Sequence, residues 1–143
     1  MGRLLGIARA TAKRAPLSEL EEAEIALATG IPGDVRGAKA GRQVTVLFRE
    51  GWASACRDLG VDLPWLMRRA NLLVEGVGLP VEGRRLVIGE AVLEVTEETK
   101  PCSVMEAAHR GLRRALTPEW RGGVCCRVIK GGQIRVGDPV DLA

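Results

Sequence analysis

Aromatic side chains are scarce in this sequence. It contains no tyrosine, one phenylalanine and three tryptophans among 143 residues. Proteins that bind single-stranded nucleic acid stack unpaired bases on aromatic rings, so this scarcity argues against such a surface. The net charge of +3 comes from 21 basic and 18 acidic residues, an excess too small to indicate nucleic acid by itself. We expect no nucleic-acid partner, whereas a small anion stays open as a ligand.

Cysteines and long apolar runs are limited as well. The four cysteines, at positions 56, 102, 125 and 126, form no CxxC pair, which argues against a disulfide scaffold and a structural zinc site. No apolar run approaches the roughly 18 residues that a membrane-spanning helix needs. We therefore expect a cytoplasmic protein that does not enter a membrane.

The N-terminal segment contains basic residues but no acidic ones. Arg3, Arg9, Lys13 and Arg14 fall within the first fourteen residues, a composition faintly like that of a transit peptide. No apolar core of a secretion signal is present, and an opening β-strand is the better interpretation. With 46% hydrophobic residues in 143, the chain is expected to form one domain over residues 1–143.

Glycine and proline divide the chain into short segments, most of which have the composition of strands. Strands are predicted at 43–48, 71–75, 84–88, 91–96, 124–129, 133–136 and after residue 139. The segments from 71 to 96 predict a meander, and Lys130-Gly131-Gly132 predicts the turn of a hairpin. Many short strands and few helices indicate a mainly β fold, an antiparallel or mixed β-barrel.

Four short helices are predicted among these strands. Their ranges are 17–28, 52–59, 63–70 and 103–116. Ser18 and Ser103 each begin a capping-box sequence, and Asp62 is a candidate cap for the third helix. Gly111 is a weak point of the last helix, because glycine lowers helix stability.

Cys102 is the most informative residue for chemistry. It follows Lys100-Pro101 and directly precedes the helix predicted at Ser103, so we expect it at a helix N-terminus. The free N–H groups there and the nearby lysine favour a thiolate over a thiol. A thiolate can bind a soft metal or carry sulfur as a persulfide. The alternative is a buried cysteine that packs as a small apolar residue, and the residues alone favour neither.

Two further segments are candidates for binding. The glycine-rich loop 30–37 carries Asp34 and Arg36 and can wrap a phosphate with its N–H groups, but a plain turn fits its composition better. Arg69 can bind phosphate through two hydrogen bonds, and Asn71 offers a donor and an acceptor to a heterocycle. The alternative for this pair is a surface arginine and an asparagine that caps its own turn.

The other cysteines and the single histidine indicate less. Cys56 is expected in the core, on a short helix. Cys125 and Cys126 are neighbours in a strand, so one is expected in the core and the other outward. His109 is expected on the surface, and nothing in the sequence places it beside Cys102 as a catalytic partner.

A series of segments, taken in order, resembles the MOSC domain, a family named for the carboxy-terminal part of molybdenum cofactor sulfurases. These segments are 30–34, 41–47, 69–76, 83–89, 93–96, 100–102, 123–128 and 137–140. They cover nearly the whole chain. The family's fold is a β-rich barrel, in agreement with the strand pattern. Cys102 matches the family's invariant cysteine, and Arg69 with Asn71 matches its pocket-lining R-x-N stretch.

The resemblance implies a role with the molybdenum cofactor, molybdopterin. Cys102 would bind the molybdenum or carry sulfur delivered by a pyridoxal-phosphate desulfurase. The residues implied to hold the anionic pterin are Arg69, Asn71, Lys100, Asp34 and Arg36. The expected partner is a desulfurase or a molybdoenzyme. Pyridoxal phosphate is expected only through a partner, the desulfurase, because no lysine here has a convincing context for its Schiff base.

One departure from the family pattern and two alternative functions remain. Many relatives have a histidine after the first loop where this chain has Val35-Arg36-Gly37, so a histidine-dependent step is not implied. A molybdenum-dependent reductase of N-hydroxylated compounds would use Cys102 as metal ligand and take electrons from elsewhere. A non-catalytic barrel would bind a partner or an anion and leave Cys102 as a packing residue.

Overall fold

The computed structural model describes residues 1–78 and 81–143. The strands are β1 (Gly2–Arg9), β2 (Ser18–Leu20), β3 (Glu22–Ile25), β4 (Val44–Phe48), β5 (Leu72–Glu75), β6 (Arg85–Ile88), β7 (Ala91–Glu98), β8 (Val124–Lys130), β9 (Gly132–Arg135) and β10 (Pro139–Leu142). The helices are α1 (Arg49–Leu59), α2 (Ser103–Ala108) and α3 (Leu112–Ala115), with the 3-10 helices η1 (Trp65–Arg68) and η2 (Pro118–Trp120).

Seven of the strands close into a barrel. Their order is β10-β6-β7-β8-β4-β5-β1, and β1 pairs with β10 to complete the ring. Neighbouring strands are antiparallel except β4 and β5, which run parallel with Val46 opposite Leu72. Closure leaves no open sheet edge in the ring. The prediction of a mainly β, mixed barrel with a few short helices is confirmed.

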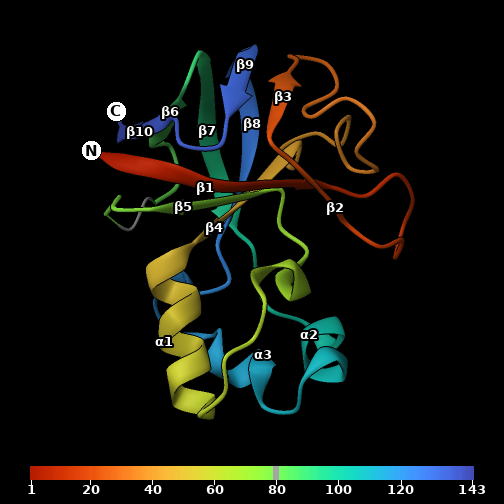
Figure 1. Ribbon diagram of the computed structural model, residues 1–143, viewed down its shortest axis with the longest axis vertical. Coiled ribbons are helices and arrows are strands. Elements are labelled where there is room, and N and C mark those ends of the chain that lie inside the picture. Colours follow the sequence, from red (N-terminus) through yellow and green to blue (C-terminus); the bar gives the residue numbers. More distant parts are fainter. Residues whose placement is uncertain (79–80) are drawn as a thin grey trace.

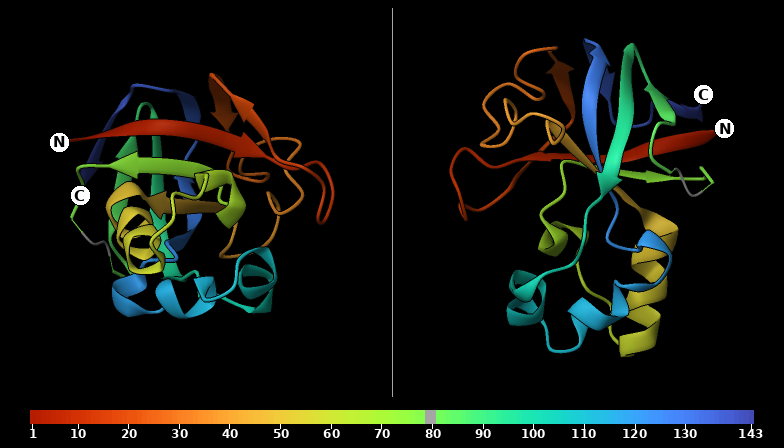
Figure 2. Two further views of the ribbon diagram at one scale, coloured as in Figure 1. Left: turned by 60° about the horizontal axis from the view of Figure 1, so that its bottom comes forward. Right: turned by 180° about the vertical axis from the view of Figure 1, so that it is seen from behind.

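The hydrophobic core has two parts, and β4 separates them. Val44, Val46 and Phe48 point into the barrel, whereas Leu47 packs on the opposite side with α1 and α3. Every residue of β4 is buried because both faces of the strand are covered. Figures 1 and 2 show the helices gathered at one end of the barrel. Among the described residues, no helix is long and apolar enough to cross a membrane.

The helix predicted at 17–28 is wrong. The segment forms β2 and β3, and Ser18 lies in a strand instead of capping a helix. Ala23 and Ile25 are buried while Glu22 and Glu24 are exposed, an alternation with the period of a strand. A helix over 17–28 would place Leu27 on the same face as Leu20, whereas Leu27 is 62% exposed.

Two predicted strand pairings are also wrong. β8 and β9 form no hairpin, because β8 already pairs with β7 on one side and β4 on the other, and β9 pairs with β3 instead. The meander begins at β6, not at β5: β5 pairs with β1 and β4, whereas β6, β7 and β8 are successive antiparallel neighbours. The expected opening strand is present as β1, and the remaining predicted strands lie within a few residues of their predicted ranges.

The other helices are partly as predicted. α1 begins three residues earlier than expected, and the helix predicted at 63–70 shrinks to η1, whose N-cap is Pro64 and not Asp62. The helix predicted at 103–116 breaks into α2 and α3 at Gly111, which has a φ of 87° that favours glycine. The second capping box does not form. Glu106 instead accepts hydrogen bonds from the backbone N–H groups of Gly111 and Arg113, which ties α2 to α3.

Candidate functional site

Two neighbouring pockets lie near the junction of the barrel and the helices, and we call them the two lobes of one groove because five residues line both. The thiol lobe, of about 630 Å³, contains Cys102. The far lobe, of about 350 Å³, contains Asn71 and Asp34. The side chains that line both lobes form a shared wall, and they are all basic: Lys13, Arg14, Arg36, Arg42 and Arg69. Each lobe has the volume of a small-molecule site.

Cys102 is exposed at the edge of the thiol lobe. It is the N-cap residue of α2, with an extended backbone, and its carbonyl accepts the N–H of Met105 at 3.0 Å. Its side chain makes no capping hydrogen bond. The expected position before a helix is therefore confirmed, although α2 has only six residues, and the alternative of a buried packing cysteine is wrong.

Arg68 is a site residue that the sequence did not single out. Its side chain is only 7% exposed, and it donates through Nε to the carbonyl of Gly122 at 3.0 Å and through Nη2 to that of Thr99 at 2.9 Å. It thereby holds the segment that leads to Cys102. Burial lowers the pKa of Arg68, whereas negative charge on Cys102 or Cys125 would raise it.

Arg69 lines both lobes from the junction between η1 and β5. Its backbone has a φ of 63°, which is uncommon for a residue other than glycine. Its Nη2 donates to the carbonyl of Ala15 at 2.6 Å and so fastens the segment that follows β1. The guanidinium has five N–H donors, so this bond leaves others for an anion.

Asn71 is buried and fastens three strands together. Its Oδ1 accepts from the backbone N–H of Thr45 at 3.0 Å and lies 3.2 Å from the Thr45 hydroxyl, while its Nδ2 donates to the carbonyl of Ala8 at 3.1 Å. It does not cap its own turn. One N–H of the amide is left over, and it is the group of Asn71 available to a ligand in the far lobe.

The loop 30–37 is held by its own hydrogen bonds. Asp34 accepts the backbone N–H of Ala10 at 3.0 Å and that of Arg36 at 3.2 Å. The N–H groups of Asp34, Val35 and Gly37 donate to carbonyl oxygens of the chain. The N–H groups of 34–37 are therefore not free to wrap a phosphate, in agreement with the plain turn that the composition favours. The side chain of Arg36 is the part of the loop that lines both lobes.

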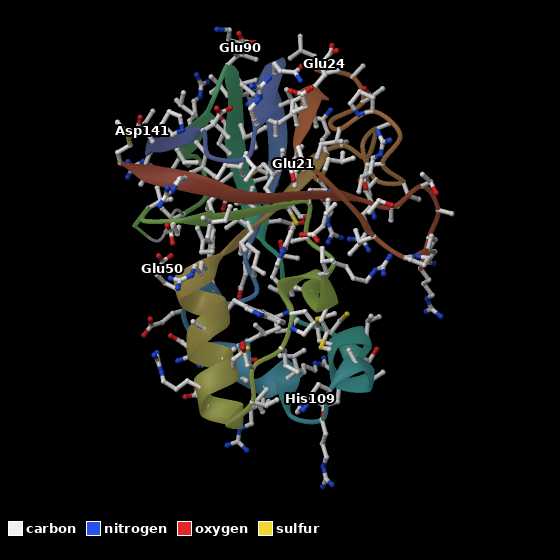
Figure 3. The ribbon with its side chains drawn as sticks, viewed as in Figure 1. Glu21, Glu24, Glu50, Glu90, His109 and Asp141 are labelled. Atoms are coloured by element: carbon white, nitrogen blue, oxygen red, sulfur yellow. The ribbon has the colours of Figure 1, made fainter. Side chains whose placement is uncertain are left out.

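The groove gathers basic side chains from segments far apart in the sequence. Those that line it are Lys13, Arg14, Arg36, Lys39, Arg42, Arg68, Arg69 and Lys100. Within residues 1–78 and 81–143, the ion pair made by this set is the one from Arg42 Nε to Glu97 Oε1, at 4.0 Å. Lys13 and Arg14, noticed only as part of a basic N-terminal segment, reach the groove in the turn after β1. The acidic residues Glu24 and Glu90 lie at the end of the molecule opposite the helices and His109 (Figure 3).

The other cysteines and His109 line neither lobe, although the Sγ of Cys125 lies 3.3 Å from the Oγ1 of Thr99, a residue of the thiol lobe. Cys126 lies in the barrel core and Cys125 on the other face of β8, as the alternation predicts, but Cys125 is buried there as well. Burial raises the pKa of the Cys126 thiol. Cys56 is in the core as predicted, and His109 is partly exposed at the end of α2. In the part of the chain that is described, no three His, Cys, Asp or Glu side chains gather to hold a metal.

Comparisons with known proteins agree on the fold. The family model for the MOSC domain matches residues 32–141. The crystal structure of YuaD from Bacillus subtilis is similar, with 22% identity, a TM-score of 0.80 and coverage of 99% of this chain and 96% of that one. YiiM from Geobacillus stearothermophilus shares 17% identity with a TM-score of 0.80, covering 100% and 75% of the two chains. YiiM from Escherichia coli shares 17% with a TM-score of 0.71, covering 99% and 69%. The comparison with curated proteins finds no match.

Proposed function

Since this chain belongs to the MOSC domain family, we propose that it binds the molybdenum cofactor in the groove through Cys102. The observation that carries the proposal is the position of the exposed thiol. Cys102 opens onto a lobe whose wall consists of basic side chains, and Lys100 and Arg68 stand beside it. A soft sulfur donor and a cationic wall are the two features that a metal-bearing, phosphorylated pterin requires.

The donor set of the groove fits this cofactor. Arg69, Arg36 and Lys100 would hold the phosphate, because guanidinium and ammonium groups are the usual partners of phosphate oxygens. Val104 and Met105 would contact the face of the pterin. Asn71 would donate its remaining N–H, and Asp34 would act indirectly, by holding the loop that carries Arg36. When bound, the cofactor supplies a redox-active molybdenum centre.

A sulfur-carrier role uses the same thiol. The Cys102 thiolate would attack the outer sulfur of a persulfide on a desulfurase partner, so that a new S–S bond forms at Cys102 and the partner's cysteine leaves as a thiolate. No net oxidation occurs in this exchange. The partner would contain the pyridoxal phosphate, and the basic wall would stabilise the anionic persulfide after transfer.

The decisive experiment compares the wild type with Cys102→Ser and a matched variant of a buried cysteine, Cys56→Ser. Each protein is exposed to molybdenum cofactor released from a molybdoenzyme and, separately, to a desulfurase with cysteine. We expect the wild type and Cys56→Ser to retain molybdenum and gain the mass of one sulfur atom, and Cys102→Ser to lose both properties. The proposal is refuted if Cys102→Ser retains as much molybdenum and sulfur as the wild type, or if the wild type retains neither.

A further inference from the structure

We propose that a second pocket, at the start of α1, binds a small organic ammonium ion between the carboxylates of Glu50 and Glu119 and against the indole of Trp120. The pocket has a volume of about 170 Å³ and shares no lining residue with either lobe of the groove. α1, which contributes Glu50, and α2, which begins after Cys102, lie on opposite sides of the helical end of the molecule (Figures 1 and 3). This ligand is therefore additional to the one proposed for the groove, and its binding does not depend on Cys102.

The pocket lies between the first turns of α1, the segment after β5 and the turn that contains η2. The backbones approach closely here: a Cβ added to Gly51 would lie 3.2 Å from the Cα of Arg121, which is tighter than an ordinary contact. Phe48, which is 6% exposed, and Val77 supply apolar surface to the lining. The volume is below the roughly 300 to 1,000 Å³ of a site for a drug-sized ligand, so we expect a small ligand.

Two carboxylates face this pocket with charge to spare. Within residues 1–78 and 81–143, Glu119 makes no ion pair. Glu50 accepts the backbone N–H of Gly76 through Oε2 at 3.0 Å, which leaves its Oε1 available. A carboxylate accepts hydrogen bonds and attracts cations, so both side chains suit a ligand with positive charge.

The basic side chains near the pocket already have partners. Arg121, which lines the pocket, donates through Nη1 to Asp58 Oδ2 at 2.7 Å. Arg57 does not line the pocket, and its Nη2 donates to the hydroxyl of Ser54 at 3.1 Å. A ligand in this pocket therefore meets carboxylates, whereas a ligand in the groove meets arginine and lysine.

Trp120 gives the pocket an aromatic wall. Its side chain packs against the barrel core and is only partly buried, so that part of the indole lines the pocket. Glu119 and Trp120 have φ values of 50° and 54°, which places two consecutive residues other than glycine in the left-handed region. Backbone of this kind persists only where the surrounding structure holds it, and here it brings a carboxylate and an indole to one pocket. The face of an indole attracts cations more strongly than the other aromatic rings do.

Two probes of the same shape and different charge test the proposal. They are choline and its neutral carbon analogue, in which a tert-butyl group replaces the trimethylammonium group. Each is titrated into isotope-labelled wild-type protein, and the resonance of the Trp120 indole N–H, assigned with Trp120→Phe, reports binding at this pocket. We expect choline to bind about fivefold or more tightly than the neutral analogue. Equal affinities, or no shift of this resonance with either probe, overturn the proposal.

A third probe distinguishes a free ammonium compound from a lysine side chain of another protein. N-acetyl-lysine methylamide presents a primary ammonium group in the form that a protein offers. Because the pocket is small, we expect choline to bind more tightly, which assigns the pocket to a free ammonium ion. Tighter binding of the lysine derivative would keep the ammonium group but overturn its assignment to a small free ligand.

Substitutions of Glu119 give a second readout. Glu119→Gln removes the charge alone, so it should weaken choline binding about threefold and leave binding of the neutral analogue unchanged. Glu119→Gly should weaken choline binding as well, and it suits the turn because glycine favours a positive φ, so a failure to fold would not explain the loss. Glu24→Gln is the matched control, since Glu24 is exposed at the end of the molecule opposite the helices (Figure 3), and it should bind choline as the wild type does. Unchanged choline affinity in Glu119→Gln contradicts the proposal.

Discussion

The barrel wall and the groove use the same residue, arginine, in opposite ways. On the wall, Arg85 and Arg127 both contact Glu94, and on the separate β3–β9 sheet Arg135 contacts Glu22 at 2.8 Å. In the groove, the basic side chains lie together with few acidic partners. The small net charge of +3 hides this difference, because it averages a paired surface with a cationic one. Charges that remain unpaired inside a groove are available to an anion from solution.

The largest contrast that we predict is between the thiol of the groove and those of the barrel. Iodoacetamide should label Cys102 in the native protein, whereas Cys125 and Cys126 react only when the structure opens. Because burial also raises the pKa of the Cys126 thiol, we expect native labelling of the buried thiols to be at least roughly 100-fold slower. Mass spectrometry of tryptic peptides over time measures each site.

The control for this contrast is Cys102→Ser. It should remove the fast phase and leave the slow sites unchanged, and denaturation of the wild type should make all four cysteines react. Fast native labelling of Cys125 or Cys126 would show that the wall is open at β8 and would end the contrast between the two regions.

The second prediction concerns Asn71, which lies on the boundary and serves the barrel. Asn71→Ala removes the acceptor of the Thr45 N–H and the donor to the Ala8 carbonyl, both buried, so we expect a loss of about 3 kcal/mol in the free energy of unfolding. Urea denaturation followed by tryptophan fluorescence measures it. Gln133→Ala, at an exposed amide, should cost less than about 0.5 kcal/mol. A loss below about 1 kcal/mol for Asn71→Ala would mean that the amide is not needed by the strands.

The third prediction reverses one charge inside the groove and one outside it. Arg36→Glu in the groove should weaken the binding of inorganic pyrophosphate about tenfold at low salt, and the difference should shrink at high salt as the charges are screened. Arg135→Glu on the β3–β9 sheet changes the net charge equally and breaks the contact with Glu22, yet it should leave pyrophosphate affinity within about twofold. Equal losses in the two variants would show that overall charge, and not the groove, attracts the anion.

The sequence predicts the barrel better than it predicts the groove. The alternation of Val44, Val46 and Phe48 is local, and the strand follows from it directly. At 17–28 two local patterns compete: Leu20 and Leu27 fit a helix, whereas Ala23 and Ile25 fit a strand. Pairing with β1 and β9 decides for strands, and that pairing is not visible in the segment itself.

The site is predictable only where a single segment contains its signal. Cys102 stands out because Lys100, Pro101 and the following helix are its neighbours in sequence. The basic wall does not, because Arg14, Arg36 and Arg69 come from three segments that only the closed barrel brings together. Arg68 and Arg69 are adjacent and chemically identical, and backbone geometry alone sends one into the interior and the other to the groove.

The smallest effect that we predict is the acid dependence of the paired wall. The hydrogen bond from Arg127 is the largest cause that lowers the pKa of Glu94 below its ordinary value of 4.5, with a smaller contribution from Arg85. A depressed folded-state pKa stabilises the protein above the unfolded value, and this contribution is lost as the pH falls through the folded value. The wild type should therefore lose slightly more unfolding free energy than Glu94→Gln between neutral pH and about pH 3. Glu82→Gln, at an exposed glutamate, serves as the control and should follow the wild type. If the unfolding free energies of the wild type and Glu94→Gln fall equally with pH, the charges of the wall are no better paired than those of the groove.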